Sequence, residues 1–94
     1  MAVVTAFVMI KTSGRSASAV AQQIAEVEGV AEVYSVTGDH DLIAILHLPE
    51  YERLAEVVPD RIAMTEGVMH TTTIMAFRSY SKSDLDVAWD IGLS

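Results

Sequence analysis

The chain has 94 residues, 51% of them hydrophobic, with no cysteine and a formal net charge of −7 at pH 7. This length suits one domain, and the apolar content excludes an intrinsically disordered chain. The longest apolar stretch, 2–10, is too short for a membrane-spanning helix, which takes about 20 residues. The absence of cysteine excludes disulfides and thiolate metal sites, and the acidic charge argues against direct nucleic-acid binding. We therefore expect a cytoplasmic protein that contacts neither membrane nor DNA by itself.

The first half of the chain has the pattern of a strand, a helix and a second strand. Residues 3–10 are mostly β-branched or aromatic, which is typical of a buried strand. Residues 16–28 are predicted to form a helix that Ser16 caps and Gly29 ends. Its apolar stripe consists of Val20, Ile24 and Val27. Residues 31–37 are predicted to form the second strand.

The second half has the same pattern. Residues 42–48 are apolar and predict a strand, and Pro49 then opens a helix that ends at Gly67. Pro59 interrupts this helix, because proline has no N–H to donate and costs about 3 kcal/mol in a helix interior. We expect a kink or a new helical start there, and a last strand over residues 68–78.

An internal repeat supports this division into halves. A shift of 38 positions places residues 24–30 on residues 62–68, with identical Ile, Ala, Glu, Gly and Val at corresponding places. Two such halves predict an α+β, ferredoxin-like βαββαβ sandwich, with a four-stranded antiparallel sheet and two helices on one face. We expect the first and third strands to be central and parallel to each other. This domain covers residues 1–80, and Ser83 begins a predicted short helix in a tail of residues 81–94.

The second face of the predicted sheet is also apolar. In the first and third strands, both sets of alternating side chains are largely hydrophobic. Two helices cover only one face, and a large exposed apolar patch is rare on a soluble monomer. One alternative is that the tail helix covers this face. We favour a second subunit that packs sheet against sheet with two-fold symmetry.

Polar groups concentrate in one turn, Thr37–Asp41. An ordinary hairpin explains glycine and aspartate there. A second interpretation is a site for a free amino acid: backbone N–H groups near Gly38 bind the carboxylate, and Asp39 or Asp41 pairs with the ammonium. The histidines are scattered and form no catalytic set. The candidate ligand-binding residues are Gly38, Asp39, His40, Asp41 and Thr72, and we predict no catalytic residue, metal ligand or cofactor.

These residues resemble a known family. The pattern Val33-x-x-Val36-Thr37-Gly38-Asp39-x-Asp41-Leu42, followed by Glu66-Gly67-Val68 and a threonine-rich last strand, is similar to the effector-binding (RAM) domain of Lrp/AsnC transcription regulators. The resemblance covers about residues 3–79. It implies a ferredoxin-like fold, sheet-to-sheet homodimers, higher rings of dimers, and amino-acid binding between dimers at the turn after the second strand. His40 stands where the family often has an aromatic residue.

The resemblance also bears on partners. The first strand begins almost at Met1, which leaves no room for the helix-turn-helix of the full regulators, so we expect a stand-alone domain. It would be a non-enzymatic sensor that acts through its own assembly or with a full-length Lrp/AsnC regulator. The alternative is a small cofactor-free monooxygenase of the dimeric ferredoxin-like barrel type, with His47, Trp89 and Tyr34 as the residues to suspect. A third alternative is an oligomerisation module without a ligand.

Overall fold

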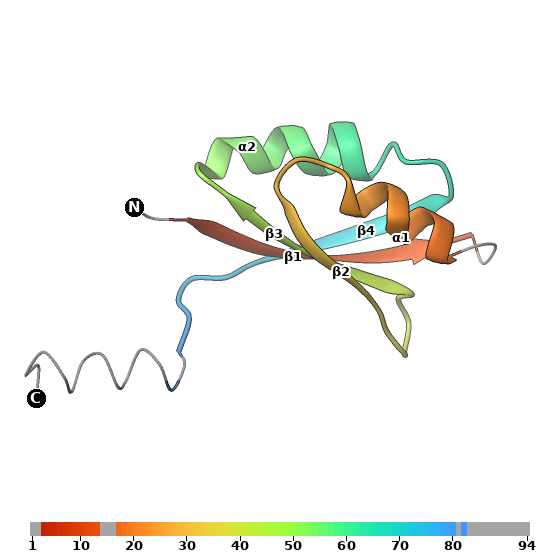
Figure 1. The fold of residues 1–94 in the computed structure, drawn as a ribbon, viewed down its shortest axis with the longest axis horizontal. Helices are drawn as coiled ribbons and strands as arrows, with labels where there is room; N and C mark the ends of the chain where they lie inside the picture. The colour runs from red at the N-terminus through yellow and green to blue at the C-terminus, as the bar shows by residue number, and fades with distance from the viewer. Residues whose placement is uncertain (1–2, 14–16, 81, 83–94) are drawn as a thin grey trace, which may run out of the picture.

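The computed structural model describes residues 3–13, 17–80 and 82. The elements follow the predicted order along the chain (Figure 1). They are β1 (Val4–Thr12), α1 (Ala17–Ala25), β2 (Val30–Ser35), β3 (Leu42–Leu48), α2 (Tyr51–Glu56), the π-helical segment η1 (Val57–Ile62) and β4 (Val68–Met75). The predicted cap Ser16 and the predicted tail helix from Ser83 lie outside the described residues.

The four strands form one sheet in the order β2-β3-β1-β4, in which all neighbours are antiparallel. Both helices lie on the same face (Figure 1), so the predicted ferredoxin-like α+β fold is confirmed. The expectation that the first and third strands run parallel is wrong: β1 and β3 are central but antiparallel. The reason is the short turn between β2 and β3, which reverses the chain, so that β1 runs in the same direction as β2 and not as β3.

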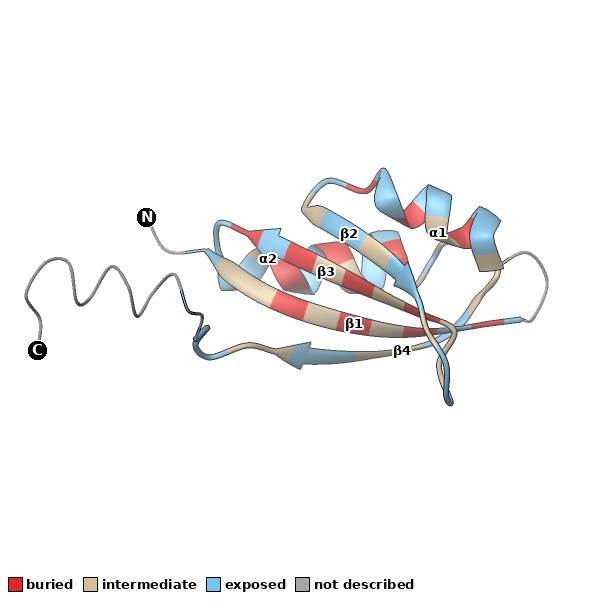
Figure 2. Cartoon of the chain, turned by 60° about the horizontal axis from the view of Figure 1, so that its bottom comes forward, coloured by how far each residue is buried: buried red, intermediate tan, exposed pale blue. Residues whose placement is uncertain are grey.

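The core lies between the helices and the covered face of the sheet. Alternate side chains along β1 and β3 are buried, and the strands show this as alternating bands in Figure 2. The side chains with no exposed surface at all are Ala6, Val8, Ile10, Ile24, Leu42, Ala44, Leu46 and Ile62. Alternation with a period of two places these strand residues on one face, as the sequence predicts.

The two halves of the chain repeat each other in detail. After α1, the amide of Val27 donates to the carbonyl of Ile24 and that of Val30 to the carbonyl of Val27. The same two bonds recur 38 residues later, from Thr65 to Ile62 and from Val68 to Thr65. Gly29 and Gly67 both have a φ of 97°, a backbone conformation that glycine adopts readily. The structure therefore bears out the matching pattern of elements in the two halves.

The irregularity expected at Pro59 takes the form of wider helical turns. The helix continues from Glu56 into η1, where the amide of Ala63 donates to the carbonyl of Val58 at 2.8 Å, five residues earlier. A π-helical turn leaves room for the proline ring and for its missing N–H without ending the helix. Ile62 therefore still reaches the core.

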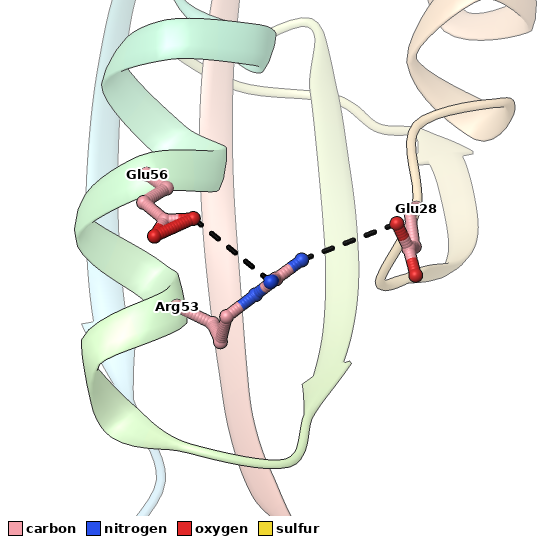
Figure 3. A network of polar contacts seen from close by, with 3 residues as sticks. All are labelled: Glu28, Arg53 and Glu56. Carbon is pink, nitrogen blue, oxygen red and sulfur yellow. Dashed lines mark ion pairs between the residues drawn. The ribbon is translucent and has the colours of Figure 1, made fainter.

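Arg53 links the second helix to the end of the first. Its guanidinium lies 4.0 Å from the Glu28 carboxylate, which follows α1, and 4.0 Å from that of Glu56 (Figure 3). The three side chains are 39%, 84% and 65% exposed. Ion pairs this long and this exposed contribute little stability.

The other face of the sheet, here called the open face, carries no helix among the residues that the structure describes (Figure 1). Strand register places two rows of side chains across it, one from each of the four strands in turn. The rows are Thr72, Met9, Ile43 and Tyr34, and then Ile74, Phe7, Ile45 and Glu32. Tyr34 and Ile74 are 49% and 48% exposed. The open face is thus largely apolar, as the sequence indicates.

Several element boundaries differ from the prediction. The first strand extends to Thr12, the first helix ends at Ala25 instead of residue 28, and the last strand ends at Met75 instead of residue 78. The second strand is shifted by one residue at its start and ends two residues early. Turns held by local backbone bonds replace the predicted ends, which residue preferences alone locate poorly.

Candidate functional site

The predicted site turn connects β2 to β3 at one end of the open face. The amide of Val36 donates to the carbonyl of Asp41 at 3.0 Å, which closes the turn. Gly38 has a φ of 110°, and a Cβ built there would meet nothing within 4 Å. Glycine is therefore needed at this position for its backbone conformation and not for lack of space. The turn leaves the backbone around Gly38 open to a ligand.

Asp41 anchors the turn to the central strand. Its amide donates to the carbonyl of Ile10 at 2.9 Å. Its carboxylate oxygen Oδ2 accepts the amide of Thr12 at 2.7 Å and the hydroxyl of Thr12 at 3.0 Å. Asp41 thus holds together two segments that are 29 residues apart in the sequence.

These bonds also set the ionisation of Asp41. The backbone amide of Thr12 lowers the pKa of the Asp41 carboxyl most, followed by the Thr12 hydroxyl. Partial burial opposes this shift, and the nearby Lys11 and His40 reinforce it. Hydrogen bonds to the charged form favour that form, so Asp41 stays a carboxylate well into acid.

Asp39 differs from Asp41 in the same turn. Its side chain is exposed and makes no hydrogen bond or ion pair with another residue that the structure describes. Its backbone carbonyl accepts the ammonium of Lys11 at 3.0 Å. Lys11 therefore bends from the end of β1 over the turn, and the Asp39 carboxylate remains available beside it.

Two histidines extend this cluster across the sheet to β4. The rings of His40 and His70 stack, with centroids 6.5 Å apart and planes at 26°. The Nε2 atom of His70 and the hydroxyl oxygen of Thr72 lie 3.4 Å apart and share a hydrogen bond. His70 also pairs with Lys11 in the register of β1 and β4. Contacts through the His70 ring therefore connect Thr72 to His40 in the turn.

The structure thus brings all five sequence-predicted residues to one corner of the sheet, four in the turn and Thr72 next to His70. Their role as ligand contacts stays a prediction. Lys11, Thr12 and His70 also lie at this corner, although they are not among the predicted site residues. Lys11 and Thr12 directly follow the predicted first strand, and a strand extended by two residues past Ile10 runs beside the turn. His70 needed the register of β4, which sequence patterns do not give.

A separate groove of about 540 Å³ lies between α2 and β4, on the covered side of the sheet. Its lining residues are Tyr51, Glu52, Leu54, Ala55, Val58, Thr73 and Met75. The enzyme alternative requires a site between helices and sheet, and it names His47, Tyr34 and Trp89. His47 and Tyr34 lie on the open face and do not line this groove. Trp89 lies outside the described residues.

Two further findings concern the described part of the chain. No three His, Asp or Glu side chains there gather closely enough to hold a metal ion. None of the helices described is both long and apolar enough to cross a membrane.

Comparison with known proteins identifies relatives. The family described as "Lrp/AsnC ligand binding domain" matches residues 5–85. An uncharacterized HTH-type transcriptional regulator of Pyrococcus horikoshii is 36% identical over 76 residues, which are 78% of this chain and 51% of that protein. The chain therefore spans about half the length of the curated relatives it matches.

Solved structures agree with the sequence comparison. The crystal structure of a Thermus thermophilus protein is similar with a TM-score of 0.79 and 47% identity, over 84% of this chain and 99% of that one. The feast or famine regulatory protein of M. tuberculosis, complexed with L-methionine, has a TM-score of 0.70 and 23% identity, over 84% of this chain and 54% of that one. At this lower identity the likeness concerns the fold alone.

Proposed function

The chain belongs to the family of Lrp/AsnC ligand-binding domains, and from this premise we propose that it is an amino-acid sensor whose effector binds at the Gly38–Asp41 turn. It acts without catalysis, in the cytoplasm, through its own oligomer or through a full-length Lrp/AsnC regulator, and it does not bind DNA by itself. The L-methionine complex of a protein with the same fold supports a free amino acid as the class of effector.

The observation that carries this proposal is the unequal state of the two turn carboxylates. Asp41 is engaged by Thr12, while the Asp39 carboxylate beside it has no partner among the described residues. Asp39 is therefore our choice for the ammonium of the effector. The open backbone at Gly38 supplies N–H donors for the α-carboxylate. The corner thus offers groups that are complementary to both charges of a zwitterion.

The open face supports the assembly part of the proposal. Its half-buried Phe7, Met9, Ile43 and Ile45 suit a second copy packed sheet against sheet. The effector corner lies at the end of this same face. A ligand that contacts residues near the edge of the assembly favours the assembled state, which links sensing to oligomerisation.

A thermal-shift screen of the twenty amino acids, followed by calorimetry on the strongest hit, tests the proposal. A ligand that binds only the folded state raises the melting temperature. We expect Asp39→Asn to weaken binding by about one to two decades, because it removes a charge-assisted bond. Asp60→Asn, on the exposed surface of η1, is the control and leaves the affinity unchanged. The proposal fails when no amino acid binds at millimolar concentration.

A further inference from the structure

We propose that the preferred effector is an amino acid with a second carboxylate in its side chain, received by His40, His70 and Lys11. This inference rests on the proposed function and names the ligand class of the same site. It concerns the side-chain end of the effector, whereas the Gly38–Asp39 part of the turn holds the amino-acid end.

The three receiving groups converge from three different elements. Lys11 comes from the end of β1, His40 from the turn and His70 from the beginning of β4. The ring of His40 stacks on that of His70, and the Lys11 ammonium crosses to the carbonyl of Asp39. Lys11 and His70 are exposed and His40 is half-buried, so a ligand can reach all three.

These groups have partners within the chain before a ligand arrives. The Thr72 hydroxyl lies within hydrogen-bond distance of the Nε2 atom of His70, at 3.4 Å, and the ring of His70 stacks against that of His40. Asp41 ties the turn itself to β1 through Thr12. Recognition by groups that are already positioned costs less side-chain entropy than recognition by free surface chains.

The local charge determines which side chain suits the corner. Besides the two rings, the corner holds the carboxylates of Asp39 and Asp41, the ammonium of Lys11 and the hydroxyl of Thr72. Asp39 is matched by the effector ammonium and Asp41 by Thr12, which leaves Lys11 for a further anion. An imidazole N–H can donate a hydrogen bond to the same anion.

An apolar or amide side chain does not satisfy the same groups. It leaves the ammonium of Lys11 without an anion. The isosteric pairs L-glutamate with L-glutamine and L-aspartate with L-asparagine isolate this difference, because each pair differs only in the side-chain group.

Titration calorimetry with these four amino acids at pH 7 tests the inference. We expect the acid to bind at least about tenfold more tightly than its amide, the size of one charge-assisted bond.

Histidine variants locate the effect. His40→Asn and His70→Asn are each expected to abolish the preference for the acid, measured as the ratio of the affinities for the acid and its amide. His47→Asn is the matched control, since this remaining histidine lies on β3 and shares a hydrogen bond of 3.2 Å with the hydroxyl of Thr5, away from the corner. It keeps the preference.

Three results are decisive. Equal affinity for acid and amide overturns this inference and leaves the proposed function intact when either one binds. A preference that survives in both His40→Asn and His70→Asn also overturns it. Failure of every amino acid to bind removes the proposed function itself, which is a different outcome from loss of selectivity.

Discussion

At the scale of single residues, the carboxylates of Asp41 and Asp39 differ in their contacts. Asp41 holds the turn against β1 through the amide and hydroxyl of Thr12, and Asp39 stays available. Both carboxylates stand in a turn that the sequence marks as a candidate site. The sequence does not distinguish them, because the partner of Asp41 is 29 residues away and is placed by strand register.

The lowered pKa of Asp41 makes part of the folding stability depend on pH. A carboxyl whose pKa is lower in the folded state stabilises the fold above its unfolded pKa, and this contribution is lost as the pH falls through the folded value. We expect Asp41→Asn to lower the free energy of unfolding at pH 7 and to flatten its decline below pH 4. Urea denaturation between pH 7 and pH 2 measures both.

Asp39→Asn is the control for this experiment, because it changes the same charge in the same turn without breaking a side-chain bond to a described residue. It is expected to leave the stability and its pH dependence close to those of the parent. Identical profiles for the two variants would mean that the Thr12 bonds do not stabilise Asp41 in solution.

At the scale of elements, glycines with positive φ stand in turns that differ in how much space surrounds them. Gly67 has a φ of 97°, and a Cβ there would lie 2.7 Å from the Cγ2 atom of Val20. Gly38 has a comparable φ but open space around it. Substitutions at these two positions therefore allow the cost of backbone strain to be measured separately from that of steric crowding.

We expect Gly67→Ala to destabilise the protein by about 2–4 kcal/mol, since strain of about 1–3 kcal/mol adds to crowding against α1. Gly38→Ala carries only the backbone strain and is expected to cost about 1–2 kcal/mol. Chemical denaturation at neutral pH gives both values. Equal losses at the two sites would contradict the close approach of Gly67 to Val20.

The sequence predicts the elements better than their ends. Strand 42–48 is predicted to the residue, because its apolar run is bounded by a turn and by Pro49. The end of the first helix is not, because the backbone bonds of residues 26–30 form a turn that residue preferences do not distinguish from a last helical turn. The π-helical form of η1 cannot be predicted from the sequence either, because Pro59 indicates an irregularity in the helix but not its type.

At the scale of the whole molecule, the open face is the surface on which assembly is expected to depend. The sequence indicates a second apolar face, and the register confirms which residues share it. The direction of β3 relative to β1 was predicted wrongly, although it follows from the short turn after β2.

We expect light scattering to find a dimer or a larger oligomer at micromolar concentration. Met9→Glu places a charge in the middle of the open face and is expected to dissociate the oligomer, because burying an unpaired charge is costly. Gln22→Glu, on the exposed side of α1, adds the same charge and is expected to change nothing. A stable monomer for the parent chain would contradict the packing argument.

The most direct test of the central claim is a nuclear magnetic resonance titration of the 15N-labelled protein with its best-binding amino acid. An effector at the turn is predicted to shift the amides of Gly38, Asp39 and His40 first, together with that of Thr72. The groove between α2 and β4 is the competing location, lined by Leu54, Val58 and Met75. Shifts confined to that groove, with an unchanged turn, would contradict the account.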